Sequence, residues 1–460
     1  MATHSVTMEG TLRKLLEEKK YATLRDILIT MNPSDIAAVF SELEEDRLPL
    51  LYRLLPKELA ADTFVEMEPE AQELLIRGFS DSELKEVIDE LYVDDAVDLV
   101  EEMPATVVRR ILSQADPEMR KNINELLRYP ENSAGSIMTT EYVSLRPKMT
   151  VEEAITRIRR TGVDKETIYT CYVTKERKLV GLVTVKDLLL AEDDDATMEE
   201  LMITNVISVS TMTDQEEVAQ MFSKYNFLAL PVVDTENRMV GIVTFDDAMD
   251  VMEDEATEDI QKMAAIIPSD KTYMRMTTFD IFKKRIPWLM LLMISATFTG
   301  LIISYYEKQL GAMICLTAFM PMLMDTAGNS GSQASVTIIR GLSLSELDFS
   351  DLAKVVWKEI RVAVICGLVM SLVCFGKIML VDMLLMHTHG VTPLVALVVA
   401  LTLAVTVLMA KIVGCTLPMF ADRLGFDPAV MASPFITTIV DALSLMVYFN
   451  IACALLPQLR

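Results

Sequence analysis

Two apolar stretches near the end of the chain carry polar residues that are rare in membrane-spanning segments. Residues 427–451 are long enough to cross a bilayer, yet they contain Pro434, Thr437, Thr438 and one carboxylate, Asp441, near the middle. A charge at bilayer depth costs about 2.5 kcal/mol or more, so it usually faces a protein interior or a wet path. Pro434 is expected to kink the helix and free a backbone carbonyl. Carboxylate, carbonyl and hydroxyl oxygens together suit a hard cation such as Mg²⁺ or Ca²⁺.

The other stretch, residues 312–339, is interrupted by polar and small residues from Met320 to Gln333, including Asp325 and Asn329. Polar or broken helices are tolerated in a membrane where they line a cavity. We therefore expect the two stretches to share one water-filled path. Two alternatives stay open: a seam in which small residues let helices pack closely, and a buried Asp441 bonded to neighbouring hydroxyls.

Acidic residues dominate the first 280 positions, which hold 30 Lys and Arg against 57 Asp and Glu, whereas the remainder holds 12 against 10. This balance excludes a nucleic-acid partner, which requires a basic face. It favours cation binding or simple solubility. Residues 246–267 form an acidic helix candidate in which Asp247, Asp250, Asp254 and Glu258 share one face. These charges repel one another unless cations screen them, and a solvated helix face is the alternative.

Residues 1 to about 130 are predicted to form short helices. Helix-start signals recur about every 24 residues, which indicates a superhelix of stacked repeats. The starts are Asn32-Pro33-Ser34-Asp35, Pro56-Lys57-Glu58, Ser80-Asp81-Ser82-Glu83 and Pro104-Ala105-Thr106.

Residues 136–250 instead alternate β-branched strands with helices, and the segment is duplicated. The clearest match pairs residues 179–187, LVGLVTVKD, with residues 239–247, MVGIVTFDD. The segment resembles a tandem pair of CBS domains, a regulatory module that commonly senses adenine nucleotides or ions. The resemblance makes ATP a candidate regulatory ligand; helix capping alone is the other interpretation. The candidate nucleotide contacts are Thr184, Asp187, Thr244 and Asp246.

Five membrane spans are predicted in the last 180 positions, at residues 286–305, 312–339, 355–380, 393–419 and 429–457. Most flanking Lys and Arg residues, such as Lys283, Lys284 and Arg285, fall on one side if the N-terminus is cytosolic. The first 20 residues lack the apolar core of a secretory signal. We expect a multi-pass protein of the cytoplasmic membrane, with cytoplasmic N-terminal domains and the C-terminus outside.

The order of these parts resembles the MgtE family of bacterial magnesium channels over essentially the whole chain. The most specific segments are residues 321–341 and 427–441. This chain has Ala327-Gly328-Asn329 where the family often has Gly-Gly-Asn, a departure expected to tighten the bend there. The implied class is a multidomain membrane protein with an all-α N domain, an α/β CBS pair and a helical membrane domain. The implied domains are a helical N domain (1–130), two CBS domains (136–200 and 201–250), an acidic plug helix (251–280) and a five-helix pore domain (281–460).

The resemblance implies a homodimer with the pore between its subunits, in contact with membrane lipid. Asp441 is expected to hold hydrated Mg²⁺, with help from backbone carbonyls at Thr437 and from Asn329 and Asp325. Further Mg²⁺ ions are expected to screen cytosolic acids and close the channel; without them, repulsion opens it. The expected sensor residues are Asp94, Asp95, Asp98, Asp247, Asp250, Glu253, Glu255, Glu258 and Asp259.

Two other functions compete with transport. A CBS-regulated intramembrane enzyme would need catalytic groups within the spans, but the sequence has no HExxH motif, and Asp325 and Asp441 are the acids we place deep in the membrane. A sensor that does not transport ions would not need polar residues in two spans. The residues do not distinguish Mg²⁺ from Co²⁺, Ni²⁺, Mn²⁺ or Ca²⁺ as additional permeant ions.

Overall fold

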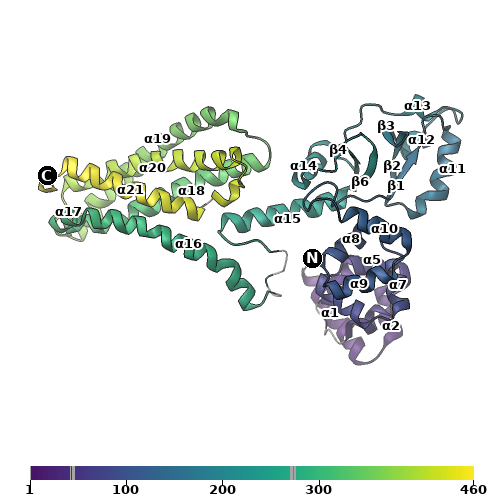
Figure 1. Cartoon of the computed structure of the whole chain (residues 1–460). Helices are drawn as coiled ribbons and strands as arrows, with labels where there is room; N and C mark the ends of the chain where they lie inside the picture. Colours follow the sequence, from purple (N-terminus) through teal and green to yellow (C-terminus); the bar gives the residue numbers. More distant parts are fainter. Residues whose placement is uncertain are drawn as a thin grey trace. The chain divides into compact units, whose positions relative to one another are not determined.

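The computed structural model describes residues 2–41, 43, 47–269, 273, 276–431 and 433–459. The chain divides into two compact units, residues 1–252 and 253–460, and each is described by itself (Figure 1). A helix, α15 (Phe245–Met263), begins in the first unit and ends in the second.

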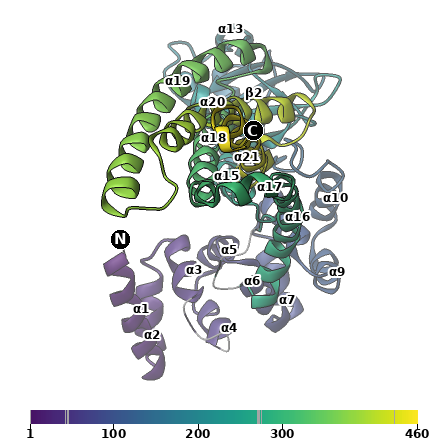
Figure 2. The ribbon, with the colours of Figure 1, turned by 90° about the vertical axis from the view of Figure 1, so that its left-hand side faces the viewer.

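The N-terminal part of the first unit is helical throughout, as predicted. After α1 (Ala2–Glu17) and α2 (Tyr21–Leu28), four helix pairs follow one another in an arc (Figure 2). The first helix of each pair begins at or next to a predicted start, because proline and serine are favoured at the first positions of a helix. The pairs are α3 (Pro33–Ser41) with α4 (Leu48–Tyr52), α5 (Lys57–Val65) with α6 (Pro69–Gly78), α7 (Asp81–Ile88) with α8 (Val93–Glu102), and α9 (Ala105–Gln114) with α10 (Pro117–Leu126).

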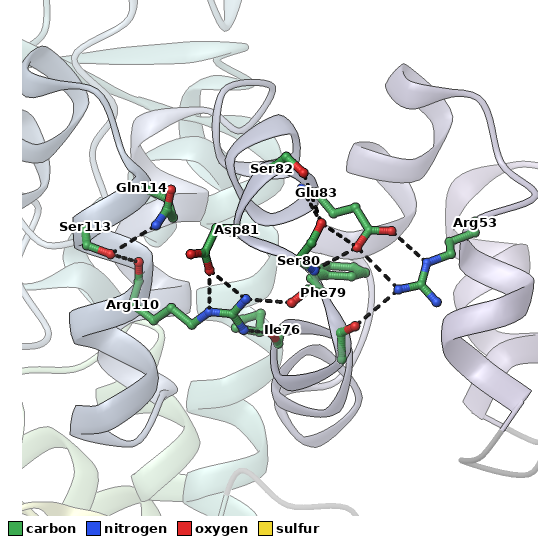
Figure 3. A network of polar contacts seen from close by, with 11 residues as sticks. Arg53, Ile76, Phe79, Ser80, Asp81, Ser82, Glu83, Arg110, Ser113 and Gln114 are labelled. Carbon is green, nitrogen blue, oxygen red and sulfur yellow. Dashed lines mark hydrogen bonds and ion pairs between the residues drawn. The ribbon is translucent and has the colours of Figure 1, made fainter.

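Two arginines tie successive pairs to the junction between α6 and α7 (Figure 3). Arg53 donates from Nε to Glu83 at 2.7 Å, and Glu83 also completes a capping box with Ser80. From the other side, Arg110 donates to Asp81 at 3.0 Å and to the carbonyl of Phe79 at 2.6 Å. These bonds satisfy carbonyls at the end of α6 and hold three neighbouring pairs in register.

The second part of the first unit contains two three-stranded sheets of the same design. In each sheet the first two strands are parallel and the last two antiparallel, which confirms the duplication. The strands are β1 (Tyr142–Leu145), β2 (Thr167–Lys175), β3 (Lys178–Thr184), β4 (Val209–Ser210), β5 (Ala229–Val233) and β6 (Met239–Thr244). The accompanying helices are α11 (Val151–Thr161), η2 (Gly162–Asp164), α12 (Val185–Leu189), α13 (Met198–Leu201) and α14 (Gln215–Tyr225).

The second unit is a helical bundle in which α18, α20 and α21 lie together and α19 packs on α20 (Figure 1). α16 contacts α21 and has no buried residue. The long helices of the second unit are α16 (Thr278–Tyr305), α18 (Met320–Ser343), α19 (Leu352–Lys377), α20 (Pro393–Arg423) and α21 (Ser433–Leu455). The short segments are α17 (Glu307–Ala312), η3 (Ile314–Phe319), η4 (Phe349–Asp351), the π-helix η5 (Ile378–Leu385), η6 (Pro428–Met431) and η7 (Pro457–Leu459).

Four helical segments among the described residues are long and apolar enough to cross a membrane: Thr278–Tyr305, Phe349–Leu385, Pro393–Arg423 and Pro428–Leu455. They correspond to four of the five predicted spans. The remaining one corresponds to α18, whose 24 residues include Asp325, Asn329 and Gln333. Its helix begins at Met320 rather than near residue 312, with Pro321 in the first turn.

The predicted kink at Pro434 is wrong. Pro434 is the second residue of α21, where a helix has no intrahelical partner for the backbone N–H that proline lacks. The acidic helix predicted at residues 246–267 forms as α15, which ends at Met263.

Candidate functional site

Asp441 lies on α21 beside a glycine of α18. A Cβ atom placed on Gly328 would lie 3.1 Å from Thr437 Cγ2 and 3.8 Å from Asp441 Oδ1. The absent side chain therefore lets the backbone of α18 approach the carboxylate, as small residues do between membrane helices. Asp325, one turn earlier on α18, is near enough to interact electrostatically with Asp441. Of the predicted pore residues, Asp325, Thr437 and Asp441 thus come together.

The Asp441 carboxylate is half-buried and forms no hydrogen bond or ion pair with any residue that the structure describes. The two neighbouring hydroxyls do not reach it. Thr437 and Thr438 each donate to the carbonyl of Pro434 at 3.0 Å. The structure therefore does not support the alternative in which threonine hydroxyls satisfy a buried aspartate.

α18 has two different faces. One is a tight seam of small residues, where a Cβ atom on Gly331 would lie 3.0 Å from Ile436 Cγ2 and 3.1 Å from the carbonyl oxygen of Ala410. A Cβ atom on Gly414 of α20 would collide with the backbone of Gly331. The other face is polar and exposed within a single chain, with Asp325, Asn329 and Gln333 four residues apart. The packing seam and an exposed polar face are therefore both present on one helix.

Sequence reasoning missed an ion pair inside the bundle. Lys411 of α20 is 6% exposed and lies 3.6 Å from Glu359 of α19. A lone lysine near the middle of a 31-residue apolar helix was the available signal, because such a charge needs a partner. The partner itself lies 52 positions away and could not be read from spacing.

In the first unit, carboxylates of α8 face the start of α15. Asp94, Asp95, Asp98 and Asp247 lie close enough to raise one another's pKa. Glu166, just before β2, joins this acidic cluster. No described Lys or Arg forms an ion pair with any of these five side chains. The cluster was predicted except for Glu166, which the α/β segment supplies from a distant position.

Burial and mutual repulsion raise the pKa values in the acidic cluster. Burial, followed by the charge of Asp247, raises the pKa of Asp95 to about 7. Burial and the charges of Asp94 and Asp95 raise the pKa of Glu166 to about 8. Burial raises the pKa of both Asp94 and Asp247, which also repel each other. Removal from bulk water and the charge of Asp247 raise the pKa of Asp98, although this side chain keeps solvent contact.

The acidic cluster suits a hydrated cation better than a bare one. Among the described residues, no three His, Cys, Asp or Glu side chains are close enough to form a compact metal site. Asp94 Oδ1 and Glu166 Oε2 are nevertheless buried without a hydrogen-bond partner. Mg²⁺ gives up its waters reluctantly, so carboxylates that are spread apart can bind it through those waters.

The end of α15 docks within the second unit. Lys262 bridges Glu258 at 2.5 Å and Asp427 at 2.6 Å, and Ser343 of α18 donates to Asp259 at 3.1 Å. Of the other predicted sensor acids on α15, Asp250 and Glu253 are exposed and Glu255 is half-buried. Glu258 and Asp259 therefore already have partners, and one of these partners is a lysine.

The two sheets end in equivalent Thr-x-x-Asp motifs. Thr184 Oγ1 donates to Asp187 at 2.6 Å, and Thr244 pairs with Asp247 in the same way. Asp247, rather than the exposed Asp246, is thus the counterpart of Asp187. Each motif caps a helix, and Asp247 also belongs to the acidic cluster.

Comparison with protein families and solved structures gives the same order of parts. The model of the MgtE intracellular N domain matches residues 31–132, that of the CBS domain matches residues 134–194 and 198–254, and that of the divalent cation transporter MgtE matches residues 320–451. The soluble part of a magnesium transporter is similar, with 33% identity and a TM-score of 0.51, over 55% of this chain and 99% of that one. The cytosolic domain of the Mg²⁺ channel MgtE in complex with ATP shows 38% identity and a TM-score of 0.50, over 53% of this chain and 99% of that one.

Full-length relatives extend the match to the membrane unit. The magnesium transporter MgtE of Bacillus subtilis is 34% identical over 97% of this chain and 96% of its own length. That of Thermus thermophilus is 37% identical over 451 residues, which are 97% of this chain and 98% of the relative. With this identity along nearly the whole of both chains, the protein belongs to the MgtE family of magnesium transporters, and not to a family of enzymes.

Proposed function

We propose that two copies of this chain form a Mg²⁺ channel of the cytoplasmic membrane, with a pore that passes Asp441 and the polar face of α18. The observation that carries the proposal is the carboxylate itself. Asp441 lies within an apolar helix, next to the backbone of Gly328, with no described partner. An unpaired carboxylate at bilayer depth is costly unless water or a cation reaches it.

A second copy would complete the site. The exposed polar face of Asp325, Asn329 and Gln333 is unfavourable against lipid and is expected to be covered by its counterpart or by water. Two copies of Asp441 would then face one wet path. Such a pair would hold Mg²⁺ through its waters, and binding of this kind is weak enough for the ion to leave.

The acidic cluster would make the channel responsive to cytosolic Mg²⁺. Without the ion, the charges on α8 and at the start of α15 repel, and the elements that carry them separate. With the ion, the charges are screened and the closed arrangement is favoured. A shift from mostly open to mostly closed requires about 5.5 kcal/mol of differential binding, which several divalent ions shared among these carboxylates can supply.

Adenine nucleotide is the second ligand that we propose, at the first Thr-x-x-Asp motif. The relative solved in complex with ATP matches the first unit at 38% identity. Asp187 lies in the first turn of α12, just after β3, and is half-buried, so the motif is available to a ribose while Thr184 caps α12.

Ion flux into liposomes tests the proposal. Wild-type protein should admit Mg²⁺ to a vesicle that holds a Mg²⁺-sensitive dye, and millimolar Mg²⁺ on the cytosolic face should reduce the flux. The triple variant Asp247→Asn, Asp250→Asn and Glu258→Gln should conduct with reduced closure, because fewer charges remain for the ion to screen.

A matched control changes acids of an exposed loop, Glu192→Gln with Asp194→Asn. This variant should close as the wild type does. Closure of the triple variant with unchanged Mg²⁺ sensitivity would refute the repulsion mechanism. Absence of flux through the wild-type protein would leave a sensor that does not transport ions.

A further inference from the structure

One cavity in the first unit is basic, in a part of the chain that is otherwise strongly acidic. It has a volume of about 340 Å³, and the described residues that line it include three cationic side chains and no carboxylate. Arg157 comes from α11, Lys165 from the segment before β2, and Arg177 from the turn between β2 and β3. Three separate elements therefore bring positive charge to one place.

Among the side chains that the structure describes, none supplies a counter-charge to these cations. Arg157, Lys165 and Arg177 form no ion pair with any described residue, although the chain has 67 Asp and Glu side chains. Arg157 and Lys165 are half-buried and Arg177 is exposed. Cations this close together repel one another, so an arrangement that keeps them unpaired is explained by an anion from solution.

Hydroxyl groups complete the lining. Thr140, Tyr142, Ser144 and Thr161 border the cavity. Three of these hydroxyls already donate or share a proton: Tyr142 with the carbonyl of Met239 at 3.3 Å, Thr161 with that of Arg157 at 3.0 Å, and Ser144 with Thr174 at 2.8 Å. These three hydroxyls are thus already hydrogen-bonded within the protein, and the positive charge of the cavity comes from the three cations.

We propose that this cavity binds a small anion that carries at least two phosphate groups. Arginine and lysine are the side chains that recognise phosphate, arginine by paired hydrogen bonds and lysine as a point charge. The volume lies at the lower end of the range for small-molecule sites, which is about 300–1,000 Å³, and exceeds what one phosphate group needs.

This site is distinct from the two Thr-x-x-Asp motifs. None of Thr184, Asp187, Thr244 and Asp247 lines the cavity. The lining instead joins the first sheet to Met239 and Val240 of the second. A bound phosphate compound would therefore bridge the two sheets and give the regulatory unit an input that depends neither on ribose nor on Mg²⁺ in the acidic cluster.

Calorimetric titration of the purified full-length protein with inorganic pyrophosphate, in buffer without Mg²⁺, tests the site. Pyrophosphate has neither ribose nor base, so it probes the charges alone. Wild-type protein should bind it, and Arg157→Ala with Lys165→Ala should weaken binding at least about tenfold, because each lost charged hydrogen bond accounts for that much. Two controls should bind pyrophosphate as the wild type does. One is the double variant Arg159→Ala with Arg160→Ala, which changes two exposed residues of the same helix. The other is the single variant Asp187→Ala.

A further variant tests the same site even if the Arg157/Lys165 double variant does not fold. Arg177 has a positive φ of 67°, so Arg177→Gly removes the charge at a position where glycine suits the backbone. This variant should fold and should weaken pyrophosphate binding. The proposal fails if wild-type protein does not bind pyrophosphate, if the Arg157/Lys165 and Arg177 variants bind it with wild-type affinity, or if only Asp187→Ala loses binding.

Discussion

Asp441 has a chemical role because of what surrounds it. Gly328 brings a backbone rather than a side chain to the carboxylate, and both nearby threonine hydroxyls donate elsewhere. The polar groups described around Asp441 offer oxygen atoms, and oxygen is the ligand that Mg²⁺ prefers. The same backbone approach makes the site sensitive to any added methyl group.

Gly328→Ala should therefore reduce Mg²⁺ flux and lower stability by about 1–3 kcal/mol, because the new Cβ would lie 3.1 Å from Thr437 Cγ2. Flux into liposomes and thermal unfolding in detergent measure the two effects. Gly376→Ala on α19 is the matched control, since its Cβ would meet nothing within 4 Å. Equal flux through both variants would show that α18 and α21 do not form the path.

The acidic cluster predicts an unusual dependence of stability on pH. The pKa of Asp95 is about 7 in the folded chain against an ordinary value of 3.8. Its contribution to stability is fully present below the unfolded-state pKa and is lost as pH rises through the folded-state pKa, because the folded chain then loses the proton too. Without Mg²⁺, the melting temperature of the first unit should fall by several degrees between about pH 5 and about pH 8.

Magnesium should oppose this loss at the high end of the range, because it replaces the proton as counter-charge. Asp95→Asn with Asp98→Asn should flatten the pH profile and reduce the stabilisation by Mg²⁺. Differential scanning calorimetry measures both. A profile that is flat for the wild-type protein, or that rises toward pH 8 without Mg²⁺, would contradict the assigned pKa values.

At the scale of elements, α19 and α20 are joined by a charged pair inside an apolar bundle. Removing one partner of a buried pair leaves the other charge unpaired and costs about 3–5 kcal/mol, whereas replacing both with apolar residues is often neutral. Glu359→Gln should therefore lower the unfolding temperature in detergent markedly. Glu359→Leu with Lys411→Met should recover most of the loss. If the double variant is as unstable as the single one, the two residues do not act as a pair.

Helix starts were predictable because capping is local. The proline and serine signals near residues 33, 56, 80 and 104 mark the first helix of each pair in the N domain, since the chemistry that starts a helix lies within a few residues. The position of Pro434 was not predictable in this way. Where α21 begins depends on how η6 and α20 pack around it, so the same proline lies in the first turn of a helix instead of bending one.

At the scale of the whole molecule, the order of parts could be predicted from composition, period and duplication, because each of these changes along the chain. Pairings across long separations could not. Glu166 joins the acidic cluster from another domain, and the basic cavity collects Arg157, Lys165 and Arg177 from three elements. The positions of charged residues along the sequence do not show which of them remain without an ion-pair partner once the chain has folded.

The two units carry complementary halves of the proposed mechanism. The first concentrates negative charge that a divalent ion would screen, and the second holds Asp441 of α21 against the backbone of Gly328 in α18, near Asp325. α15 begins beside the first feature and ends docked beside α18 through Lys262 and Asp259. In the proposed mechanism, a change in the acidic cluster would act on the start of this helix, whose last residues belong to the second unit.

The central claim is that magnesium passes Asp441, and the most direct measurement is Mg²⁺ flux through Asp441→Asn in liposomes. The substitution keeps size and shape and removes the charge. Flux should be abolished or gravely impaired while thermal unfolding stays near that of the wild type, and Glu346→Gln, an exposed acid between α18 and α19, should conduct normally. Wild-type flux through folded Asp441→Asn would contradict the account.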